Sequence, residues 1–104
     1  MYTFIELKPF ADVREKYLDD DEFITLQQYL IANHETGDVI PRSGGCRKIR
    51  WSAEGRGKRG GVRIIYFLKL PPGTIVLVTM YAKNVRDTID SGILKRLKEH
   101  FDHD

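Results

Sequence analysis

A dense group of basic residues in the middle of the chain is the first feature that could do chemistry. Between Arg42 and Arg63 the sequence has eight cationic side chains and one acid, a net charge of +7 in this window against +2 for the whole chain. Glycines at positions 55, 57, 60 and 61 lie in the same window, and they let a backbone approach a ligand without an intervening Cβ. A concentrated positive field beside a glycine-rich loop is typical of a site that binds a polyanion such as a phosphate chain.

Aromatic residues accompany these cations. Proteins bind single-stranded RNA with basic side chains that contact phosphates and with aromatic side chains that stack on bases. We therefore predict an RNA-binding set in the basic strand and its neighbours, made of Arg47, Lys48, Arg50, Trp51, Tyr66 and Tyr81. Two plainer interpretations stay open: lysines and arginines on an edge strand protect a sheet from aggregation, and the aromatic rings could fill the core of a small sheet.

Other chemistries fit the sequence less well. Gly55 to Gly60 match the glycine spacing of a dinucleotide-binding loop, but the segment joins two predicted strands instead of a strand and a helix. The three histidines lie in polar or terminal helical contexts, so we expect no metal site, and no cofactor is expected. Cys46 is the only cysteine, which excludes an internal disulfide. It is either a small apolar residue at a strand start or a thiol made reactive by Arg47 and Lys48.

Length and charge distribution limit the class of protein. A chain of 104 residues is expected to form a single domain, residues 1–104. No segment approaches the ~20 apolar residues of a membrane span, and residues 2–7 alternate instead of forming the apolar block of a signal peptide. We therefore expect a cytoplasmic protein with no membrane partner. Residues 1–40 carry a net charge of −6, which indicates a solvated helical surface or a partner surface.

Hydrophobic periodicity predicts an α+β domain. Residues 3–7 alternate as a short strand, and two helices follow, the first starting near Pro9 and the second capped by the acids from Asp19 and ended by Gly37. Residues 47–52 have the two-residue period of a strand, and residues 62–70 are predicted as a strand because they are β-branched and aromatic. After a turn at 71–73, residues 74–81 are predicted as a strand that is central and covered on both faces, because residues 75–78 are continuously apolar. The tail is predicted to be helical from Val85, with Asp90 or Ser91 as a cap. The resulting order is β-α-α-β-β-β-α, with the helices packed on one small, antiparallel-rich sheet.

Several segments together resemble a known family. The chain is similar over about residues 2–100 to the RelE/HigB toxins of bacterial type II toxin–antitoxin pairs, and most similar to the HigB-like branch. The segments that carry the resemblance are Gly37-Asp38-Val39-Ile40, Gly44-Gly45-Cys46-Arg47-Lys48-Ile49-Arg50, Gly57-Lys58-Arg59-Gly60-Gly61-Val62-Arg63-Ile64-Ile65-Tyr66 and Tyr81-Ala82-Lys83-Asn84. The family's fold, a small sheet with two packed helices, agrees with the predicted element order.

The resemblance implies a ribosome-dependent mRNA endonuclease that inhibits translation. Family members cut the codon exposed in the ribosomal A site by using the RNA's own 2′-hydroxyl as the nucleophile. Such in-line attack needs a base, an acid and cations that stabilise the extra charge on phosphorus. Arg63, on a strand and always charged, suits that last role, while neighbouring arginines would lower the pKa of Lys58 and make it a conceivable proton-transfer group. The catalytic set so implied is Arg56, Lys58, Arg59, Arg63 and Lys83.

Two departures from the family pattern leave parts of this assignment open. Ala82 replaces the usual glycine before Lys83, and residues 86–90 lack the tyrosine that well-studied RelE members have early in the last helix. Either Tyr81 or Tyr66 would substitute for that tyrosine, or the base would be a lysine. The alternative functions are a ParE-like gyrase poison on the same fold and a non-catalytic RNA-binding module.

The resemblance also implies partners. A cognate antitoxin would hold the protein inactive, and in the HigB-like branch that antitoxin usually carries a helix-turn-helix. Contact with DNA would then run only through this HigA-like partner, whereas the ribosome and mRNA would be direct partners.

Overall fold

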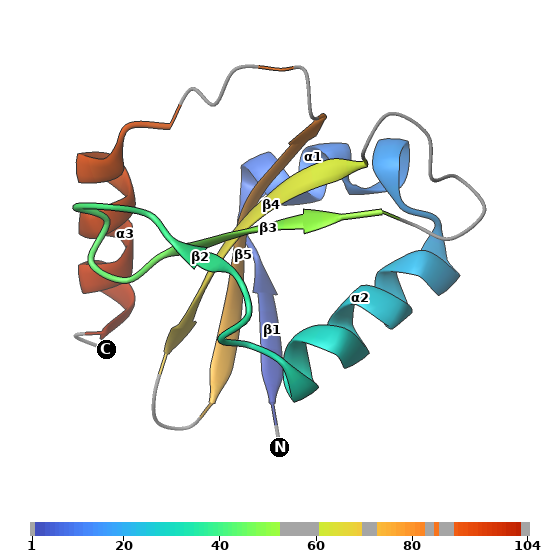
Figure 1. The fold of residues 1–104 in the computed structure, drawn as a ribbon, viewed down its shortest axis with the longest axis horizontal. Helices are drawn as coiled ribbons and strands as arrows, with labels where there is room; N and C mark the ends of the chain where they lie inside the picture. Colours follow the sequence, from blue (N-terminus) through green and yellow to red (C-terminus); the bar gives the residue numbers. More distant parts are fainter. Residues whose placement is uncertain (1, 53–60, 70–72, 83–84, 86–88, 103–104) are drawn as a thin grey trace.

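Helices cover both faces of a five-stranded sheet in the computed structural model of the chain (Figure 1). The structure describes residues 2–52, 61–69, 73–82, 85 and 89–102. The element order confirms an α+β domain, and it contains one short strand more than the sequence predicts. The elements are β1 (Thr3–Glu6), α1 (Lys8–Tyr17), α2 (Asp20–Ala32), β2 (Asp38–Val39), β3 (Arg47–Trp51), β4 (Val62–Lys69), β5 (Thr74–Ala82) and α3 (Ser91–Asp102).

The sheet has the strand order β1-β5-β4-β3-β2. The strands from β2 to β5 pair antiparallel, as the predicted meander requires, and β1 pairs parallel with β5. Gly73, at φ 100°, occupies the left-handed turn position that the sequence predicts between β4 and β5. β5 lies between β1 and β4 and is almost continuously buried, which confirms that it is an inner strand covered on both faces, although the middle strand of the five is β4.

Two hydrophobic cores lie on opposite faces of this sheet. On one face, Phe10 of α1 and Leu26 and Leu30 of α2 pack on Ile64 and Leu77. The other face is covered by α3, and its core consists of Cys46, Ile65, Phe67, Val76, Val78 and Leu94. Alternate residues of β4 therefore belong to different cores, which is the reason that its sequence is apolar almost throughout.

The residues predicted to cap the starts of α2 and α3 do cap these helices. Asp19 caps α2 as predicted: its carboxylate accepts from Glu22 N at 2.8 Å, and the Glu22 carboxylate accepts from Asp19 N at 2.8 Å. Asp90 caps α3, since its carboxylate accepts from Gly92 N. The prediction of helix from Val85 onward was wrong, because α3 begins at Ser91.

The prediction that Gly37 ends the second helix was also wrong, because α2 ends at Ala32 with Asn33 as its cap. Gly37 instead lies against the sheet, where an added Cβ would stand 2.6 Å from Ile49 Cγ2 and 3.1 Å from Lys48 O. The glycine is needed for close approach of the chain to β3, because any larger residue would push the two apart.

No helix within the described ranges is both long enough and apolar enough to cross a membrane.

The capping box gives a first prediction. Asp19→Ala removes a side-chain acceptor from the first turn of α2, and we expect the free energy of unfolding to fall by about 1 kcal/mol. Asp21→Ala, in the same turn, removes the same charge without removing the cap and should cost less. Urea unfolding of both variants measures the difference. Equal losses would show that Asp19 acts only through its charge.

Candidate functional site

Three side chains with chemical potential lie in one row across the middle strands. In the β-sheet register, Arg50 of β3 is directly opposite Arg63 of β4, which is directly opposite Tyr81 of β5. Side chains of directly opposed residues share a face, with Cβ atoms about 4.5–5.5 Å apart. Residues up to 31 positions apart in sequence thus form a short line of two guanidinium groups and a phenol.

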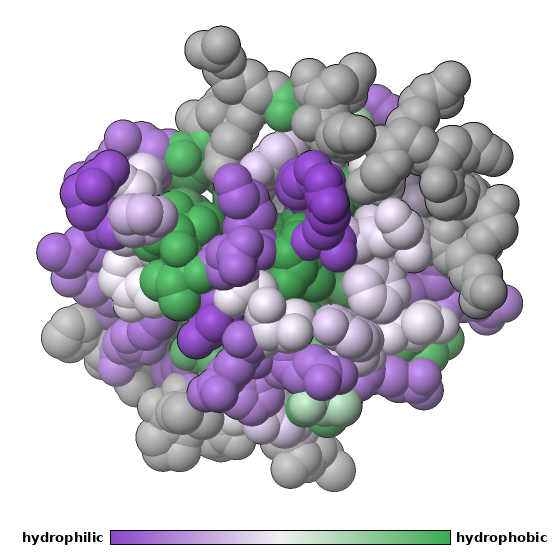
Figure 2. All heavy atoms as spheres, in the orientation of Figure 1, coloured by the Kyte–Doolittle hydropathy of each residue, from purple (hydrophilic) through white to green (hydrophobic). Residues whose placement is uncertain are grey.

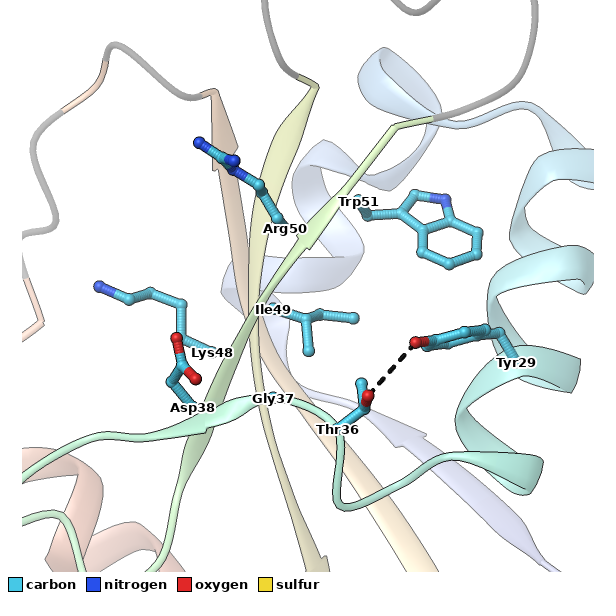
Figure 3. A pocket seen from close by; sticks show the side chains of 8 residues that line it. All are labelled: Tyr29, Thr36, Gly37, Asp38, Lys48, Ile49, Arg50 and Trp51. Atoms are coloured by element: carbon cyan, nitrogen blue, oxygen red, sulfur yellow. Dashed lines mark hydrogen bonds between the residues drawn. The ribbon is translucent and has the colours of Figure 1, made fainter.

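Lys48 extends this row on the same face. It precedes Arg50 by two residues and lies opposite Ile65, which belongs to the core beneath α3. Figure 3 shows the Lys48 and Arg50 side chains pointing to one side of β3, and the Ile49 and Trp51 side chains to the other. We call Lys48, Arg50, Arg63 and Tyr81 the cationic face.

The cationic face lies on the same side of the sheet as α3 and borders its core, against which Tyr81 packs. α3 packs where Phe67, Val76 and Val78 lie, and the Phe101 ring stands 5.7 Å from the Phe67 ring. Arg50 is exposed, and the other three members of the cationic face are half-buried. Figure 2 shows hydrophilic side chains gathered over the middle of the molecule, with apolar side chains visible between them and α3.

Two like charges lie directly opposite each other on this face. Like charges directly opposite one another in a sheet repel, and Arg50 and Arg63 are so placed. Asp38 lies opposite Lys48 on β2, yet within the described ranges no carboxylate comes within 4.0 Å of Lys48 or Arg50. A phosphate between the arginines would relieve the repulsion, because each guanidinium can donate two parallel hydrogen bonds to it.

Arg47 projects to the opposite face and serves a local structural purpose. Its Nη1 donates to Glu35 O at 2.9 Å and to Gly37 O at 2.8 Å. These bonds tie the segment after α2 to β3. The sequence places Arg47 on the other side from Lys48 and Arg50, and the structure confirms that division, which separates Arg47 from the rest of the predicted RNA-binding set.

Tyr66 also lies on the opposite face, in the core. Its ring is fully buried, and its hydroxyl donates to His34 O at 2.8 Å and accepts from Gly37 N at 3.2 Å. Burial raises the pKa of Tyr66, and the Gly37 bond and the Arg47 charge only partly oppose that rise. A buried phenol with both bonds engaged offers no ring face for a base, so we leave Tyr66 out of the interface.

Trp51 packs on α2 and not beside Arg50. Its ring centroid is 5.3 Å from that of Tyr29, and the two rings are tilted by 54°. These rings border a cavity of about 390 Å³ at the outer side of β3 (Figure 3), lined by Tyr29, Thr36, Gly37, Asp38, Lys48, Ile49, Arg50 and Trp51. Trp51 and the cations were predicted to act on one ligand, but the strand alternation places them on different faces.

The remaining predicted catalytic residues, Arg56, Lys58, Arg59 and Lys83, lie outside the described residues. Lys83 follows β5, whereas the other three lie in sequence between β3 and β4, which pair antiparallel. The glycine spacing there therefore does not stand between a strand and a helix, which excludes the dinucleotide-binding context.

Cys46 is a core residue and not a reactive thiol. It is fully buried, with its Sγ 3.6 Å from Ser43 O and 3.8 Å from Leu94 O. Burial raises the pKa of Cys46 from 9.0 to about 11, more than the Ser43 hydrogen bond and the Lys98 charge lower it. The alternative of a thiol whose pKa is lowered by Arg47 and Lys48 is wrong, because burial is the largest influence on the pKa and the cation that lowers it is Lys98.

In the described part of the chain, no cluster of three or more histidine, cysteine or acidic side chains could hold a metal ion.

Residues that the sequence analysis missed at this site are Tyr29, Thr36 and Asp38. Tyr29 lies on α2 and its hydroxyl donates to Thr36 Oγ1 at 3.4 Å, across the cavity entrance. Asp38 belongs to β2, a strand of two residues that has no readable period. These residues come close to β3 only after folding, and the sequence contains no signal of that proximity.

The comparison with known protein families adds no assignment, since no family model matches this chain.

Burial of Cys46 predicts a pH dependence of stability. Because the folded thiol has the higher pKa, the unfolded chain ionises first as the pH rises. The stabilising contribution is complete below the unfolded pKa of 9.0 and is lost as the pH approaches about 11. Across that interval, we expect wild-type stability to fall faster than that of Cys46→Ala, by roughly 1.4 kcal/mol per pH unit. Denaturant titrations at matched pH values measure this slope, and parallel slopes would contradict the assignment.

The Tyr66 hydroxyl gives a second prediction from this region. Tyr66→Phe keeps the ring but leaves His34 O and Gly37 N without their shared partner. We expect a loss of about 1–3 kcal/mol in the free energy of unfolding, because buried backbone groups are left unsatisfied. Tyr17→Phe, at a half-buried ring on α1, is the matched control and should change little. A loss below a few tenths of a kcal/mol for Tyr66→Phe would contradict the role given to the hydroxyl.

Proposed function

We propose that this chain is a toxin of the RelE/HigB kind, a ribosome-dependent endoribonuclease that inhibits translation by cutting mRNA. The observation that carries the proposal is the row formed by Arg50, Arg63 and Tyr81 on three neighbouring strands. Two guanidinium groups placed opposite each other suit one phosphate, and a phenol in the same row suits either a proton transfer or a base. The similarity of sequence segments to the toxin family points to the same chemistry independently.

The proposed reaction is attack of a ribose 2′-hydroxyl on the adjacent phosphate. The O2′–P bond forms and the P–O5′ bond breaks, which leaves a 2′,3′-cyclic phosphate and a 5′-hydroxyl. The proton of the 2′-hydroxyl goes to a base, and the departing 5′-oxygen receives a proton from an acid. Extra negative charge collects on the phosphate oxygens in the transition state, and fixed cations stabilise it most when they are already in place.

Arg63 is assigned the role of transition-state stabiliser. It lies on β4 between two paired strands and is half-buried, so its backbone is held on both sides. Arg50 is exposed on a strand with a less covered outer side, which suits a contact to the substrate phosphate. Lys48, two residues along, suits the neighbouring phosphate. Arg56, Lys58, Arg59 and Lys83 keep the roles that the resemblance implies.

Tyr81 is assigned the place of the tyrosine missing from residues 86–90. It shares the row with Arg63 and is half-buried, whereas Tyr66 is fully buried on the opposite face. Of the two tyrosines left open by the sequence, only Tyr81 is therefore positioned to meet a phosphate held by Arg63. We propose that it transfers a proton or stacks on the base.

A partner protein belongs to the proposal. A nuclease directed at mRNA is toxic unless it is held inactive, so a cognate antitoxin, of the helix-turn-helix and HigA-like kind, is expected. The cytoplasm, where ribosomes and mRNA meet, is the proposed place of action. DNA would be contacted only by the antitoxin.

Removal of the Arg63 charge tests the proposal. Induction of the wild-type chain should stop growth, and 5′-end mapping should show new mRNA ends at codons. Arg63→Gln should lower the cleavage rate by about 10²-fold or more, as expected when a transition-state donor is removed. Lys8→Gln removes one positive charge from an exposed site on α1 and is the matched control. Circular dichroism establishes that both variants fold.

Each competing function has its own outcome in this experiment. Intact mRNA with induced DNA damage signalling would identify a gyrase poison and overturn the nuclease. Intact mRNA with RNA binding that weakens evenly for every cation removed, and with a reduced salt slope, would identify a non-catalytic binding module. Growth arrest by Arg63→Gln as fast as by the wild type would remove Arg63 from the mechanism.

A further inference from the structure

Described strands cover only part of the outer edge of β3. β2 has two residues, and it pairs with Arg47 and Lys48 alone. Beyond Lys48, no strand among the described residues pairs with the outer side of β3. An uncovered strand edge presents backbone donors and acceptors that can pair with another chain.

Two glycines show toward which neighbour the carbonyl groups of β3 point. A Cβ added at Gly37 would stand 3.1 Å from Lys48 O, so this carbonyl points to the β2 side. A Cβ added at Gly61, next to β4, would meet Trp51 O, so that carbonyl points to the β4 side. Successive residues of a strand direct their N–H and C=O groups to alternate sides. The N–H and C=O of Arg50 therefore point outward, at the uncovered edge.

The two faces beside this edge differ sharply in chemistry. One face has the cavity of about 390 Å³ whose apolar walls are Tyr29, Ile49 and Trp51. The other has the Lys48 and Arg50 side chains, as Figure 3 shows. An added strand would place successive side chains on alternate faces. A segment that reads apolar–acidic–apolar would place its acid opposite Arg50 and its apolar side chains at the cavity.

A second copy of this chain is a poor occupant. Two β3 edges paired antiparallel around a two-fold axis normal to the sheet would place their cationic faces on the same side. Arg50 and Lys48 of each copy would then meet cations of the other, and like charges directly opposite are unfavourable. Charge complementarity therefore favours a different protein with acidic side chains.

We propose that the β3 edge at Arg50 binds a short extended segment of a partner protein by strand addition. The main-chain N–H and C=O of Arg50 pair with that segment. One apolar side chain of the segment enters the cavity between Tyr29 and Trp51, and the neighbouring acid meets the Arg50 guanidinium. Such strand addition combines main-chain hydrogen bonds, which give affinity, with pockets for alternate side chains, which give specificity. The inference uses no RNA chemistry and stands apart from the proposed nuclease activity.

The test uses a capped synthetic heptapeptide in which valine and phenylalanine alternate with glutamate. Trp51 is the only tryptophan and borders the cavity, so its fluorescence reports occupation directly. Addition of the peptide to the full chain should shift the emission of Trp51 in a saturable manner. Hydrogen exchange followed by NMR should show protection of the Arg50 amide.

Three matched peptides separate strand addition from general attraction. A peptide with lysine in place of each glutamate should bind at least about tenfold more weakly, because it places cations at Arg50. A peptide N-methylated at the amide that pairs with Arg50 O should also lose about tenfold, since one main-chain bond is removed. A peptide of the same composition with its glutamates in one block should lose the Trp51 response. None of these controls requires a variant of the protein to fold.

A protein variant addresses the Arg50 donor itself. Arg50→Pro removes the outward N–H without removing a bond to β4, and proline is accepted at such edge positions. Arg50→Gln removes only the guanidinium. We expect peptide affinity to fall further for Arg50→Pro than for Arg50→Gln.

Four results would overturn the proposal. The first is equal binding of the block peptide, which would indicate simple charge attraction. The second is unchanged binding of the N-methylated peptide. The third is protection of the Arg50 amide by self-association, without peptide, as protein concentration rises. The fourth is displacement of the peptide by a short oligouridine that itself protects the Arg50 amide, which would assign the edge to RNA.

Discussion

The pairing of Ile49 with Ile64 and of Trp51 with Val62 holds β3 on β4 in one register. Ile49, Ile64 and Val62 are buried in the core beneath α1 and α2. A slip of one residue would turn the whole apolar set of β3 to the other face and bring Arg50 into the core. The free energy of burying these side chains therefore decides where the cations lie. Arg50 stands opposite Arg63 because the apolar residues on the reverse face permit no other arrangement.

Because strand register fixes the backbone of the cationic face, its residues are held more firmly than residues of a loop would be. The apolar contacts that fix the register also fix the backbone positions of Arg50 and Arg63 directly opposite each other. A site whose charges are placed before the substrate arrives need not reorganise in the transition state, and that is the main source of electrostatic catalysis.

Periodicity was sufficient to predict what depends on neighbouring residues in sequence. The alternation of Arg47 with Lys48 predicted that β3 has two unlike faces, and the acids from Asp19 predicted the start of α2. Contacts between distant segments could not be read in this way. Gly37 was interpreted as a helix cap, yet its conformation is dictated by Ile49 and Tyr66, which approach it only after folding. For the same reason, Tyr66 was placed with the cations, although its pairing opposite Arg47 puts it on the other face. Trp51 differs, because the alternation along β3 alone separates it from Lys48 and Arg50.

Arg50 connects the two proposed ligands of β3. Its guanidinium belongs to the cationic face, and its backbone N–H and C=O belong to the outer edge. A partner segment whose acid engages this guanidinium competes with phosphate for the same charge, so the two ligands must weaken each other's binding by the same factor. Peptide binding at the edge would then reduce the affinity of the cationic face for RNA even though the peptide does not cover Arg63 or Tyr81. A peptide bound at the edge would thus inhibit the site through Arg50 alone, because the side chain of Arg50 contacts the RNA phosphate and its backbone pairs with the peptide.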